Sequence, residues 1–453
     1  MQITADLQLH SKYSRAVSKD MVLPQISAWT RRKGMGLVAT GDWTHPLWFR
    51  EIQTNLEELG NGLLKLKNGA DDDPLFLLAT EVSCIYSQKG KGRRVHTLIW
   101  VPTLASAEKI NKEMTHQGCN LLSDGRPIIG LTSIQVAELV LSIEPNALII
   151  PAHAWTPWFS VYGSMSGFDS LDEAYGSYAK NIYAVETGLS SSPAMNWRVS
   201  ELDNRSIVSF SDAHSGPKLG REATVFELPE VNYKCIRDAI MGSSLNSQPS
   251  IRTPHIAYTI EFYPEEGKYH WSGHRACNIR WSPQETNKNG TTCPVCGKPL
   301  TQGVEQRVGE LAGRSEESLG LSEIHYRLPD GITQVKMTGS KTFPNRPPFV
   351  MLVPLQEIIC ECIGSPVTSP KVQIPYRQLT DALGGEFAVL LSARHNDIAE
   401  IAGERVAVGI EKVRSGDLVV DPGYDGVFGV VKLWREDEAK PLVDATKEQL
   451  SIF

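Results

Sequence analysis

Apolar runs in the first half of the chain repeatedly end at, or contain, a residue type that binds metal ions. For example, LFLLATE ends at Glu81 and ALIIPAH ends at His153. The residues placed in this way are His10, Asp42, His45, Glu81, His96, His153, Glu186, Asp212 and His214. Helical patterns separate the runs, and such alternation favours a parallel sheet or a β/α barrel. Because the C-terminal ends of barrel strands meet at one face, we expect an α/β fold with a metal site there.

Imidazole nitrogens and carboxylate oxygens bind borderline and hard divalent ions. Neighbouring ions can activate a water and stabilise both oxygens of an in-line displacement at phosphorus. A lone histidine at a strand end is more often an ordinary core or surface residue, but its recurrence along the chain favours a metal site. The pattern therefore predicts hydrolysis of a phosphate ester with Mg²⁺ or Mn²⁺, and Zn²⁺ is an alternative ion.

These residues resemble the motifs of the polymerase-and-histidinol-phosphatase (PHP) superfamily. The segment Asp6-Leu7-Gln8-Leu9-His10 corresponds to the opening Asp-Leu-His-x-His motif, and the later motifs match Glu81, His96, His153 and Asp212-Ala213-His214. The resemblance implies a distorted (β/α)7 barrel with up to three metal ions. It also implies that Glu81 bridges two ions, that His96 and His153 complete one site, and that His10 and Asp212 complete another. By the same resemblance, His45 and His214 serve a third ion.

Two positions depart from the superfamily pattern. Gln8 stands in place of the first motif histidine, and Trp43 follows Asp42 where a histidine often stands. An amide oxygen is a poorer ligand than imidazole for zinc-like ions. We therefore expect one site to be weak, empty or filled by a harder ion.

A second metal motif follows the barrel segment. His274 and Cys277 are separated by two residues, as are Cys293 and Cys296. Paired spacings of this kind predict a closed structural zinc site, which stabilises a small fold and performs no catalysis. His270 is a rival fourth ligand, and His274 is preferred on spacing. The alternative is a cluster of cysteine and histidine that holds no metal.

The segment SSLNSQPSIRTPH breaks the alternating pattern and predicts a linker. A helix is expected in PPFVMLVPLQEIICECI, and strands are expected in RVAVGIEKV, DLVVDPGYDG and VFGVVKLW. The expected organisation is a barrel at 1–250, a zinc-binding module at 251–312 and a mixed α/β region at 313–453.

Composition limits the class of protein. The chain has 41% hydrophobic and 21% charged residues, and it contains no apolar run of about 18 residues that could span a membrane. Its eight cysteines do not form a disulfide framework, which suits the cytoplasm. The net charge of −7 argues against indiscriminate coating of nucleic acid, but a local basic groove remains compatible with it. Lys91, Arg93 and Arg94 precede His96 and could contact phosphate or simply face solvent.

The barrel motifs together with GKYHWSGHRAC, CPVCGKPL, RPPFVMLVPLQEII and PGYDGVFG resemble the endonuclease Q family of DNA-repair nucleases. This resemblance covers nearly the whole chain. It implies metal-dependent cleavage of DNA 5′ to deaminated bases (uracil or hypoxanthine) or abasic sites. We assign the catalytic roles to Glu81, His153, Asp212 and His214. The expected partner is DNA with damaged bases, and replication or repair proteins are further candidates.

An enzyme that reads a damaged base must take it out of the stack. Trp155, Trp158, Phe159 and Tyr162 follow His153, so they could rim the metal face and stack on the base. The alternative is that they pack the barrel mouth. Two other functions remain open: a small-molecule phosphomonoesterase, against which the zinc module and the long tail count, and a non-catalytic DNA-binding protein with a degenerate barrel.

Overall fold

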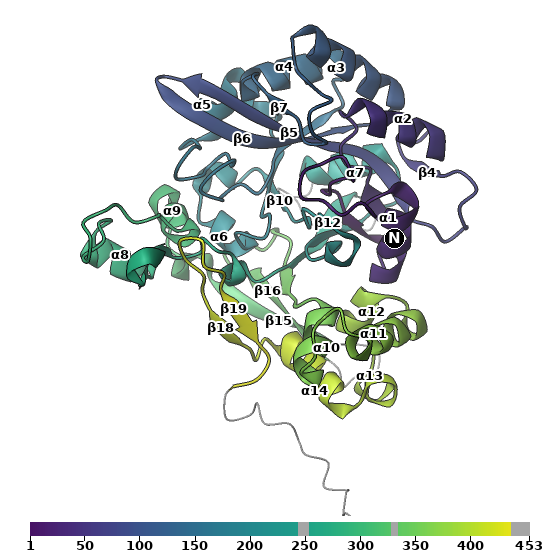
Figure 1. The fold of residues 1–453 in the computed structure, drawn as a ribbon, viewed down its shortest axis with the longest axis vertical. Helices are drawn as coiled ribbons and strands as arrows, with labels where there is room; N and C mark the ends of the chain where they lie inside the picture. The colour runs from purple at the N-terminus through teal and green to yellow at the C-terminus, as the bar shows by residue number, and fades with distance from the viewer. Residues whose placement is uncertain (243–252, 328–333, 436–453) are drawn as a thin grey trace, which may run out of the picture.

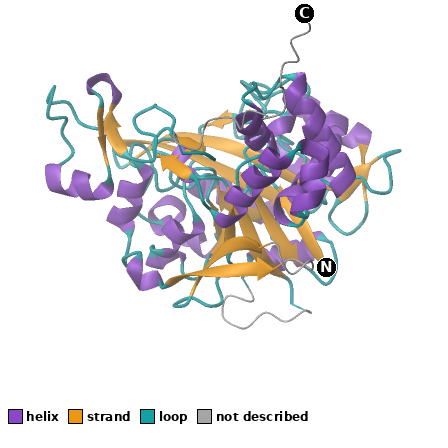
Figure 2. Ribbon diagram, turned by 90° about the horizontal axis from the view of Figure 1, so that it is seen from below, coloured by secondary structure: helices purple, strands orange, loops and turns teal. Residues whose placement is uncertain are grey.

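The structure is a computed structural model that describes residues 1–242, 253–327 and 334–435 (Figure 1). Most of the expected linker therefore lies outside the described residues. Thirteen strands form one mixed sheet, and Figure 2 shows these strands in the centre of the molecule with helices on both sides. Among the described residues, none of the helices has the length and apolar character needed to cross a membrane.

One half of this sheet carries the residues of interest. Its strands are β1 (Gln2–Asp6), β2 (Leu37–Ala39), β3 (Leu56–Glu58), β4 (Leu64–Leu66), β5 (Leu75–Gln88), β6 (Lys91–Val101), β7 (Ile128–Ile129) and β8 (Leu148–Pro151). β1, β2 and β5 are parallel neighbours, whereas β6 pairs antiparallel with both β5 and β8.

β1 also pairs antiparallel with β11, which begins the other half of the sheet. The strands of that half are β11 (Ala223–Glu227), β12 (His255–Glu261), β17 (Phe349–Met351), β16 (Gln334–Ser340) and β15 (Leu321–Arg327). Strands that follow residue 250 therefore extend the sheet that the N-terminal strands begin.

A closed barrel is not confirmed. β9 (Ala184–Glu186) and β10 (Ser206–Val208) form a separate parallel pair. A single bridge joins Leu9 to Ala213, and one hydrogen bond of 3.0 Å runs from Ala154 N to Glu186 O. These contacts bring β9 and β10 to the ends of β1 and β8, but in the described part of the chain no continuous ladder closes the ring.

The main departure from parallel order is the long hairpin of β5 and β6. Its two turn residues, Lys89 and Gly90, have φ values of 49° and 75°. Two positive φ values in a two-residue loop are typical of the tight turn whose twist matches antiparallel strands. The chain therefore returns directly along β5, and no helix separates these two strands.

Helices form where the apolar spacing predicts them. The helices of the N-terminal half are α1 (Leu23–Lys33), α2 (Pro46–Asn55), α3 (Leu104–His116), α4 (Ser133–Ile143), α5 (Leu171–Tyr175), α6 (Pro193–Trp197) and α7 (Tyr233–Ile240). α4 shows the local cause: the side chains and backbones of Thr132 and Gln135 cap its first turn reciprocally. The large side chains buried in the core beneath the helices include Trp43, Trp48, Trp100 and Trp197.

The cysteine-rich segment and the C-terminal helices lie on opposite sides in Figure 1. The first contains β13 (Ser272–His274), β14 (Ile279–Trp281), α8 (Pro283–Asn289) and α9 (Val304–Leu311). The second contains α10 (Leu355–Ile363), α11 (Pro370–Leu383), α12 (Glu386–Leu391), α13 (His395–Ala402) and α14 (Glu404–Ser415). The hairpin of β18 (Val419–Asp421) and β19 (Val430–Lys432) follows and returns to the cysteine-rich segment.

Two C-terminal predictions are wrong, one of them in part. The helix expected in PPFVMLVPLQEIICECI begins only at Leu355, because Phe349–Met351 form β17 in the sheet. RVAVGIEKV, expected as a strand, lies inside α14. Its buried residues include Val406, Ile410 and Val413, whose spacing of four and three places them on one helical face. The strands expected in DLVVDPGYDG and VFGVVKLW are present as β18 and β19.

Candidate metal centre and adjoining pocket

Two groups of side chains suited to metal ions meet beside the ends of β1 and β8. The first group is Glu81, His96 and His153, and the second is His10, Asp212 and His214. Within each group, one ligand atom per residue lies within 4.8 Å of the others. His10 connects the groups, because its Nε2 is 3.1 Å from both Glu81 Oε2 and Asp212 Oδ1.

The β5–β6 hairpin builds the first group. Glu81 lies in the middle of β5 and not at a strand end, because β5 continues to Gln88. His96 pairs across the hairpin with Ser83, two residues from Glu81, so Glu81 and His96 project from the same face. Glu81 Oε1 lies 2.5 Å from His96 Nδ1 and 3.4 Å from His153 Nε2, and the two ring nitrogens are 3.1 Å apart.

The donor atoms fit a cation. Gln8 Oε1 is buried and accepts no hydrogen bond from any residue that the structure describes, and the buried oxygens Glu81 Oε1 and Asp212 Oδ1 face ring nitrogens of His96, His153 and His10. Buried carboxylate oxygens need a proton donor or a cation, and imidazole nitrogens facing the same space supply the remaining ligands for a divalent ion. The two groups can therefore hold metal ions.

At Glu81 and His96, electrostatics favour the protonation states that metal binding requires. Burial raises the pKa of Glu81, but the charges of Arg126 and His96 outweigh burial and hold this pKa well below its ordinary value. Burial lowers the pKa of His96 to about 4. An ionised carboxylate and a neutral imidazole are the forms that bind metal. At His10, burial lowers the pKa, but the carboxylates of Asp42, Asp212 and Glu81 outweigh burial and raise this pKa well above its ordinary value, so an ion must displace a proton there.

The sequence pattern does not predict Arg126 as a site residue. Its Nη1 lies 3.5 Å from Glu81 Oε1 and 3.5 Å from His10 Nε2, so its positive charge faces both groups. Arg126 lies in the segment SDGRPII, just before the two-residue strand β7. That strand is too short for the apolar-run pattern to reveal.

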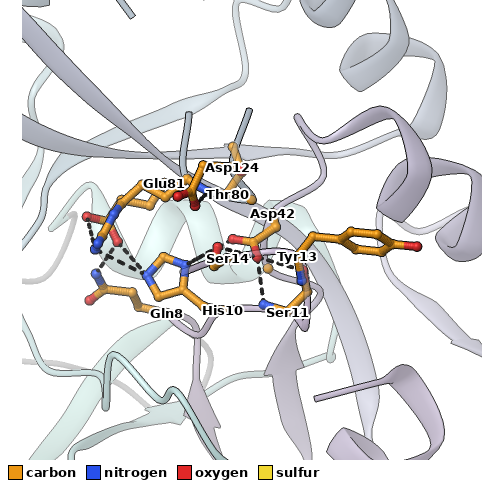
Figure 3. Close-up of polar contacts among 12 residues, drawn as sticks. Gln8, His10, Ser11, Tyr13, Ser14, Asp42, Thr80, Glu81 and Asp124 are labelled. Atoms are coloured by element: carbon orange, nitrogen blue, oxygen red, sulfur yellow. Dashed lines mark hydrogen bonds and ion pairs between the residues drawn. The ribbon is translucent and has the colours of Figure 1, made fainter. Parts of the chain in front are cut away.

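Asp42 lies behind His10 and outside both groups, although the sequence predicts it as a ligand (Figure 3). Its Oδ1 is 2.9 Å from His10 Nδ1. Its Oδ2 accepts hydrogen bonds from Ser11 N at 2.6 Å, Ser11 Oγ at 2.7 Å and Ser14 Oγ at 2.8 Å. Both carboxylate oxygens are thus used, and Asp42 orients His10 so that Nε2 faces Glu81 and Asp212.

His45 also lies outside both groups. Its Nδ1 accepts a hydrogen bond from Trp48 N at the start of α2, and its ring stacks on Tyr13 with centroids 4.4 Å apart. A third site that uses His45 with His214 is therefore not assembled among the described residues, because capping and stacking hold the ring of His45 elsewhere.

Glu186 supports the backbone of a neighbouring ligand. Its Oε2 accepts a hydrogen bond of 2.7 Å from His153 N. Burial raises the pKa of Glu186 well above its ordinary value, and the negative charges of Asp212 and Glu81 raise it further. Glu186 therefore belongs to neither group, and its carboxylate holds the backbone N–H of His153.

The backbone is strained at three of the predicted metal ligands. Asp42, His153 and Asp212 have φ values of 41°, 30° and 47°. Such conformations cost on the order of 1–3 kcal/mol each and cluster at functional sites. Gly188 packs directly on His153, and a Cβ added at Gly188 would overlap the Cβ of His153. The loop after β9 therefore needs glycine there.

An aromatic pocket of about 520 Å³ adjoins the first group. Trp158 and Phe159 form part of its wall, and the ring of Phe159 lies 4.8 Å from the ring of His96. Tyr269 and Phe428 line the same pocket from other segments, together with Arg94, Lys268, Gly188, Leu189 and Ser190. The sequence pattern did not reveal Tyr269, Lys268 or Phe428 as pocket residues, because they are distant along the chain from the barrel motifs that end at His153 and Glu186.

Two predicted rim residues are core residues instead. Trp155 and Tyr162 are both fully buried, and their rings stack with centroids 4.7 Å apart. Trp155 Nε1 donates to Asn196 Oδ1 at 2.8 Å, and the Tyr162 hydroxyl donates to Glu201 Oε2 at 2.7 Å. Because both rings are buried and their polar groups are hydrogen-bonded within the protein, neither ring can stack on a ligand.

The three predicted basic residues differ in their surroundings. Arg93 donates to the carbonyl of Gly167 and packs over Phe168, 4.0 Å from the ring centroid. Arg94 is exposed, lines the pocket and lies 5.5 Å from the centroid of Phe159. Lys91 is exposed at the start of β6. Arg94 therefore lies nearest to the site.

The cysteine cluster forms a separate candidate metal site. His274, Cys277, Cys293 and Cys296 place one ligand atom each within 4.8 Å of the others. Burial raises the pKa of Cys293, but hydrogen bonds from the backbone N–H groups of Cys296 and Val295 bring it down to about 6. His270, the rival ligand, is not in this group, and its Nε2 lies 3.6 Å from Glu305 Oε2.

The mixed sheet, the paired ligand groups and the cysteine cluster define a metal-binding α/β protein. Solved structures show a close likeness. The chain is 31% identical to the lesion-specific endonuclease PfuEndoQ from Pyrococcus furiosus, with a TM-score of 0.78 over 95% of each chain. It is also 31% identical to endonuclease Q in complex with a 27-mer duplex that has an abasic lesion at the active site, with a TM-score of 0.78 over 98% of this chain and 100% of that chain. The chain belongs to the endonuclease Q family.

The chain also has sequence relatives in other organisms. The protein YqxK of Bacillus subtilis is 28% identical over 450 residues, which cover 95% of this chain and 99% of YqxK. The protein MJ0043 of Methanocaldococcus jannaschii is 30% identical over 286 residues, but these cover only 31% of MJ0043 and 62% of this chain. The family model of the MJ0043 C-terminal domain matches residues 354–417.

Proposed function

We propose that this protein is a metal-dependent DNA-repair endonuclease that hydrolyses the phosphodiester 5′ to a deaminated base or an abasic site. The observation that carries the proposal is the meeting of two metal-ligand groups through His10, directly beside an aromatic pocket. The names of the two similar structures support it, since one is a lesion-specific endonuclease and the other holds duplex DNA with an abasic lesion.

The same proposal includes the finer architecture. We assign the strands around the two ligand groups to a distorted PHP-type barrel, and we divide the chain into 1–250, 251–312 and 313–453. The ion of the cysteine cluster is proposed to be Zn²⁺, because thiolate and imidazole together favour that ion. Each of the other two groups combines one carboxylate with two imidazoles. We propose Mg²⁺ or Mn²⁺ there because of the carboxylates, and Zn²⁺ is the alternative that the imidazoles favour.

Divalent ions held by the two groups would activate a water and neutralise charge on the phosphate. The protein residues prepare this chemistry. Asp42 holds the Nδ1 proton of His10, so that the Nε2 lone pair faces Glu81 and Asp212. Arg126 adds a fixed positive charge that a phosphate oxygen can meet.

His214 is the candidate proton donor. Its Nδ1 donates to the Asp212 carbonyl at 2.7 Å, which holds the ring in place. Its side chain is 34% exposed, whereas His10 is fully buried. The imidazole that solvent and substrate reach in this group is therefore that of His214. We assign the protonation of the leaving 3′-oxygen to its Nε2, so that His10 and Asp212 would hold the ion of this group without His214.

The pocket supplies the specificity. Trp158, Phe159 and Tyr269 offer aromatic faces for an everted base, and the size of the pocket lies within the usual range for small ligands. Groups of residues 188–190 line the pocket and can read the edge of the base. Uracil and hypoxanthine share a keto group beside a ring N–H, so one polar wall can accept both.

The decisive assay uses duplexes with a single uracil, hypoxanthine or abasic site, with and without Mn²⁺ or Mg²⁺. We expect a metal-dependent nick 5′ to the lesion that leaves a 3′-hydroxyl. Glu81→Ala should abolish the nick, whereas Glu57→Ala, a half-exposed carboxylate on β3, should not. Release of phosphate from a small ester without nicking would show a phosphomonoesterase. DNA binding without either activity would show a non-catalytic protein.

A further inference from the structure

An exposed aromatic ring stands at the pocket. Phe428 is 70% exposed, the highest fraction among the large apolar side chains of the described residues, and it also lines the pocket with Trp158 and Phe159. Phe428 therefore reaches from the pocket wall into solvent. Its ring adds little to the hydrophobic core, because most of its surface stays in contact with water.

A rigid turn carries Phe428. Residues 422–429 connect β18 to β19, and their backbone is hydrogen-bonded to the segment 265–268. The bonds are 2.8 Å from Gly423 N to Glu265 O, 2.8 Å from Gly426 N to Lys268 O and 3.1 Å from Gly429 N to Glu266 O. A Cβ added at Gly429 would overlap the carbonyl of Glu265, so the two backbones are in direct contact. The ring is thus presented on a backbone that is fixed before any ligand arrives.

Positive charge accompanies the ring. Lys268 Nζ lies 5.7 Å from the centroid of Phe428 and 5.6 Å from that of Tyr269. Arg94 lines the same pocket. Aromatic faces combined with cations are the usual means of holding unstacked nucleic acid, because rings stack on bases while cations meet phosphates.

We propose that Phe428 is a wedge that enters the duplex at the lesion and takes the stacking place of the base that moves into the pocket. This inference rests on the proposed function. A base that leaves the stack opens a gap between its two neighbours, and apolar side chains inserted between base steps fill such gaps. Phe428 has the required properties: an apolar ring, high exposure, a rigid support and a position at the pocket.

The test compares Phe428→Ala and Phe428→Trp with the unsubstituted protein. The control is Ile374→Ala on α11, which removes another exposed apolar side chain (56% exposed). Single-turnover nicking is measured on uracil in a duplex and on uracil in a single strand, where no stack between paired bases needs to be opened. We expect Phe428→Ala to slow duplex nicking about 5- to 100-fold, in line with the loss of one aromatic stacking contact. Nicking of the single strand should change less than twofold, and Phe428→Trp should restore the duplex rate.

A second measurement reports on the stack itself. With 2-aminopurine next to the lesion and a chelator to prevent cleavage, binding of the unsubstituted protein should change the fluorescence, and Phe428→Ala should reduce that change. Equal slowing on both substrates would overturn the wedge, because Phe428 would then contact the base inside the pocket. Unchanged rates and fluorescence for Phe428→Ala would overturn it as well. Absence of nicking by the unsubstituted protein would instead refute the proposed function, and the fluorescence would still test the wedge.

Discussion

Asp42→Asn should impair metal binding by forcing His10 into the wrong tautomer. Three donors point at Asp42 Oδ2: Ser11 N, Ser11 Oγ and Ser14 Oγ. In the variant, the amide oxygen must take this position, so the amide NH₂ faces His10 Nδ1. His10 then accepts at Nδ1 and carries its proton on Nε2, which lies 3.1 Å from Glu81 Oε2 and from Asp212 Oδ1. The lone pair that a metal ion needs is lost.

The size of the effect follows from these contacts. Loss of a partner that orients a metal-bound histidine usually costs about 10- to 100-fold in metal affinity, or about 1.4–2.7 kcal/mol. In the unsubstituted protein, burial lowers the pKa of His10, but its carboxylate neighbours raise it well above the ordinary value, so an ion displaces a proton from Nε2 in both proteins. We therefore expect a loss within this range of about 10- to 100-fold.

Calorimetric titration of the metal-free protein with Mn²⁺ measures this loss, and nicking at saturating Mn²⁺ measures its consequence. Asp72→Asn makes the same chemical change at an exposed ion pair with Arg31 and should have no effect. An unchanged Mn²⁺ affinity of Asp42→Asn would refute the tautomer argument, because the structure leaves no other arrangement for the amide.

Four further predictions follow from the structure. Glu81→Gln should reduce nicking to below about one-hundredth, because a neutral amide cannot neutralise ions in both groups; a retained rate would remove Glu81 from the site. Cys293→Ser should lose the ion of the cysteine cluster and lower Tm by several degrees, as native mass spectrometry and thermal unfolding would show; retention of the ion would contradict the ligand assignment. Arg126→Ala should weaken DNA binding and reduce its salt dependence, and Arg126→Lys should restore the salt slope because it keeps the charge. Burial raises the pKa of Glu261 from 4.5 to about 7. The unfolded chain therefore ionises first, and stability should fall as pH rises from 4.5 to 7, by on the order of 3 kcal/mol. Glu261→Gln should flatten this fall in urea unfolding at pH 5 and pH 8, and an unchanged slope would count against the shifted pKa.

The chemistry of the site was easier to predict from the sequence than its geometry. Few roles other than metal binding would place histidine, aspartate and glutamate after repeated apolar runs. The structure brings together six of the residues placed in this way: His10, Glu81, His96, His153, Asp212 and His214. The pattern could not separate a ligand from the residue that orients it. Asp42 and His45 follow an apolar run as the ligands do, and only the positions of Ser11, Ser14 and Trp48 give them their other roles.

The fold departs from the prediction where a local turn outweighs the overall pattern. Lys89 and Gly90 reverse the chain in two residues, so β5 and β6 form a hairpin where alternating strands and helices predicted parallel order. In α14, alternation of valines with other residues resembled a strand, but burial of residues at helical spacing decided the outcome. The pocket joins residues from several distant segments, and no local pattern can reveal such an assembly.

The strained backbones of Asp42, His153 and Asp212 have an evolutionary consequence. Each left-handed residue costs stability that a chain under selection for folding alone would recover, for instance by replacement with glycine or asparagine. Random substitution would therefore relieve this cost soon after the side chains lost their use. A lineage without that use should carry glycine or asparagine at the three positions, whereas this protein keeps Asp42, His153 and Asp212 there.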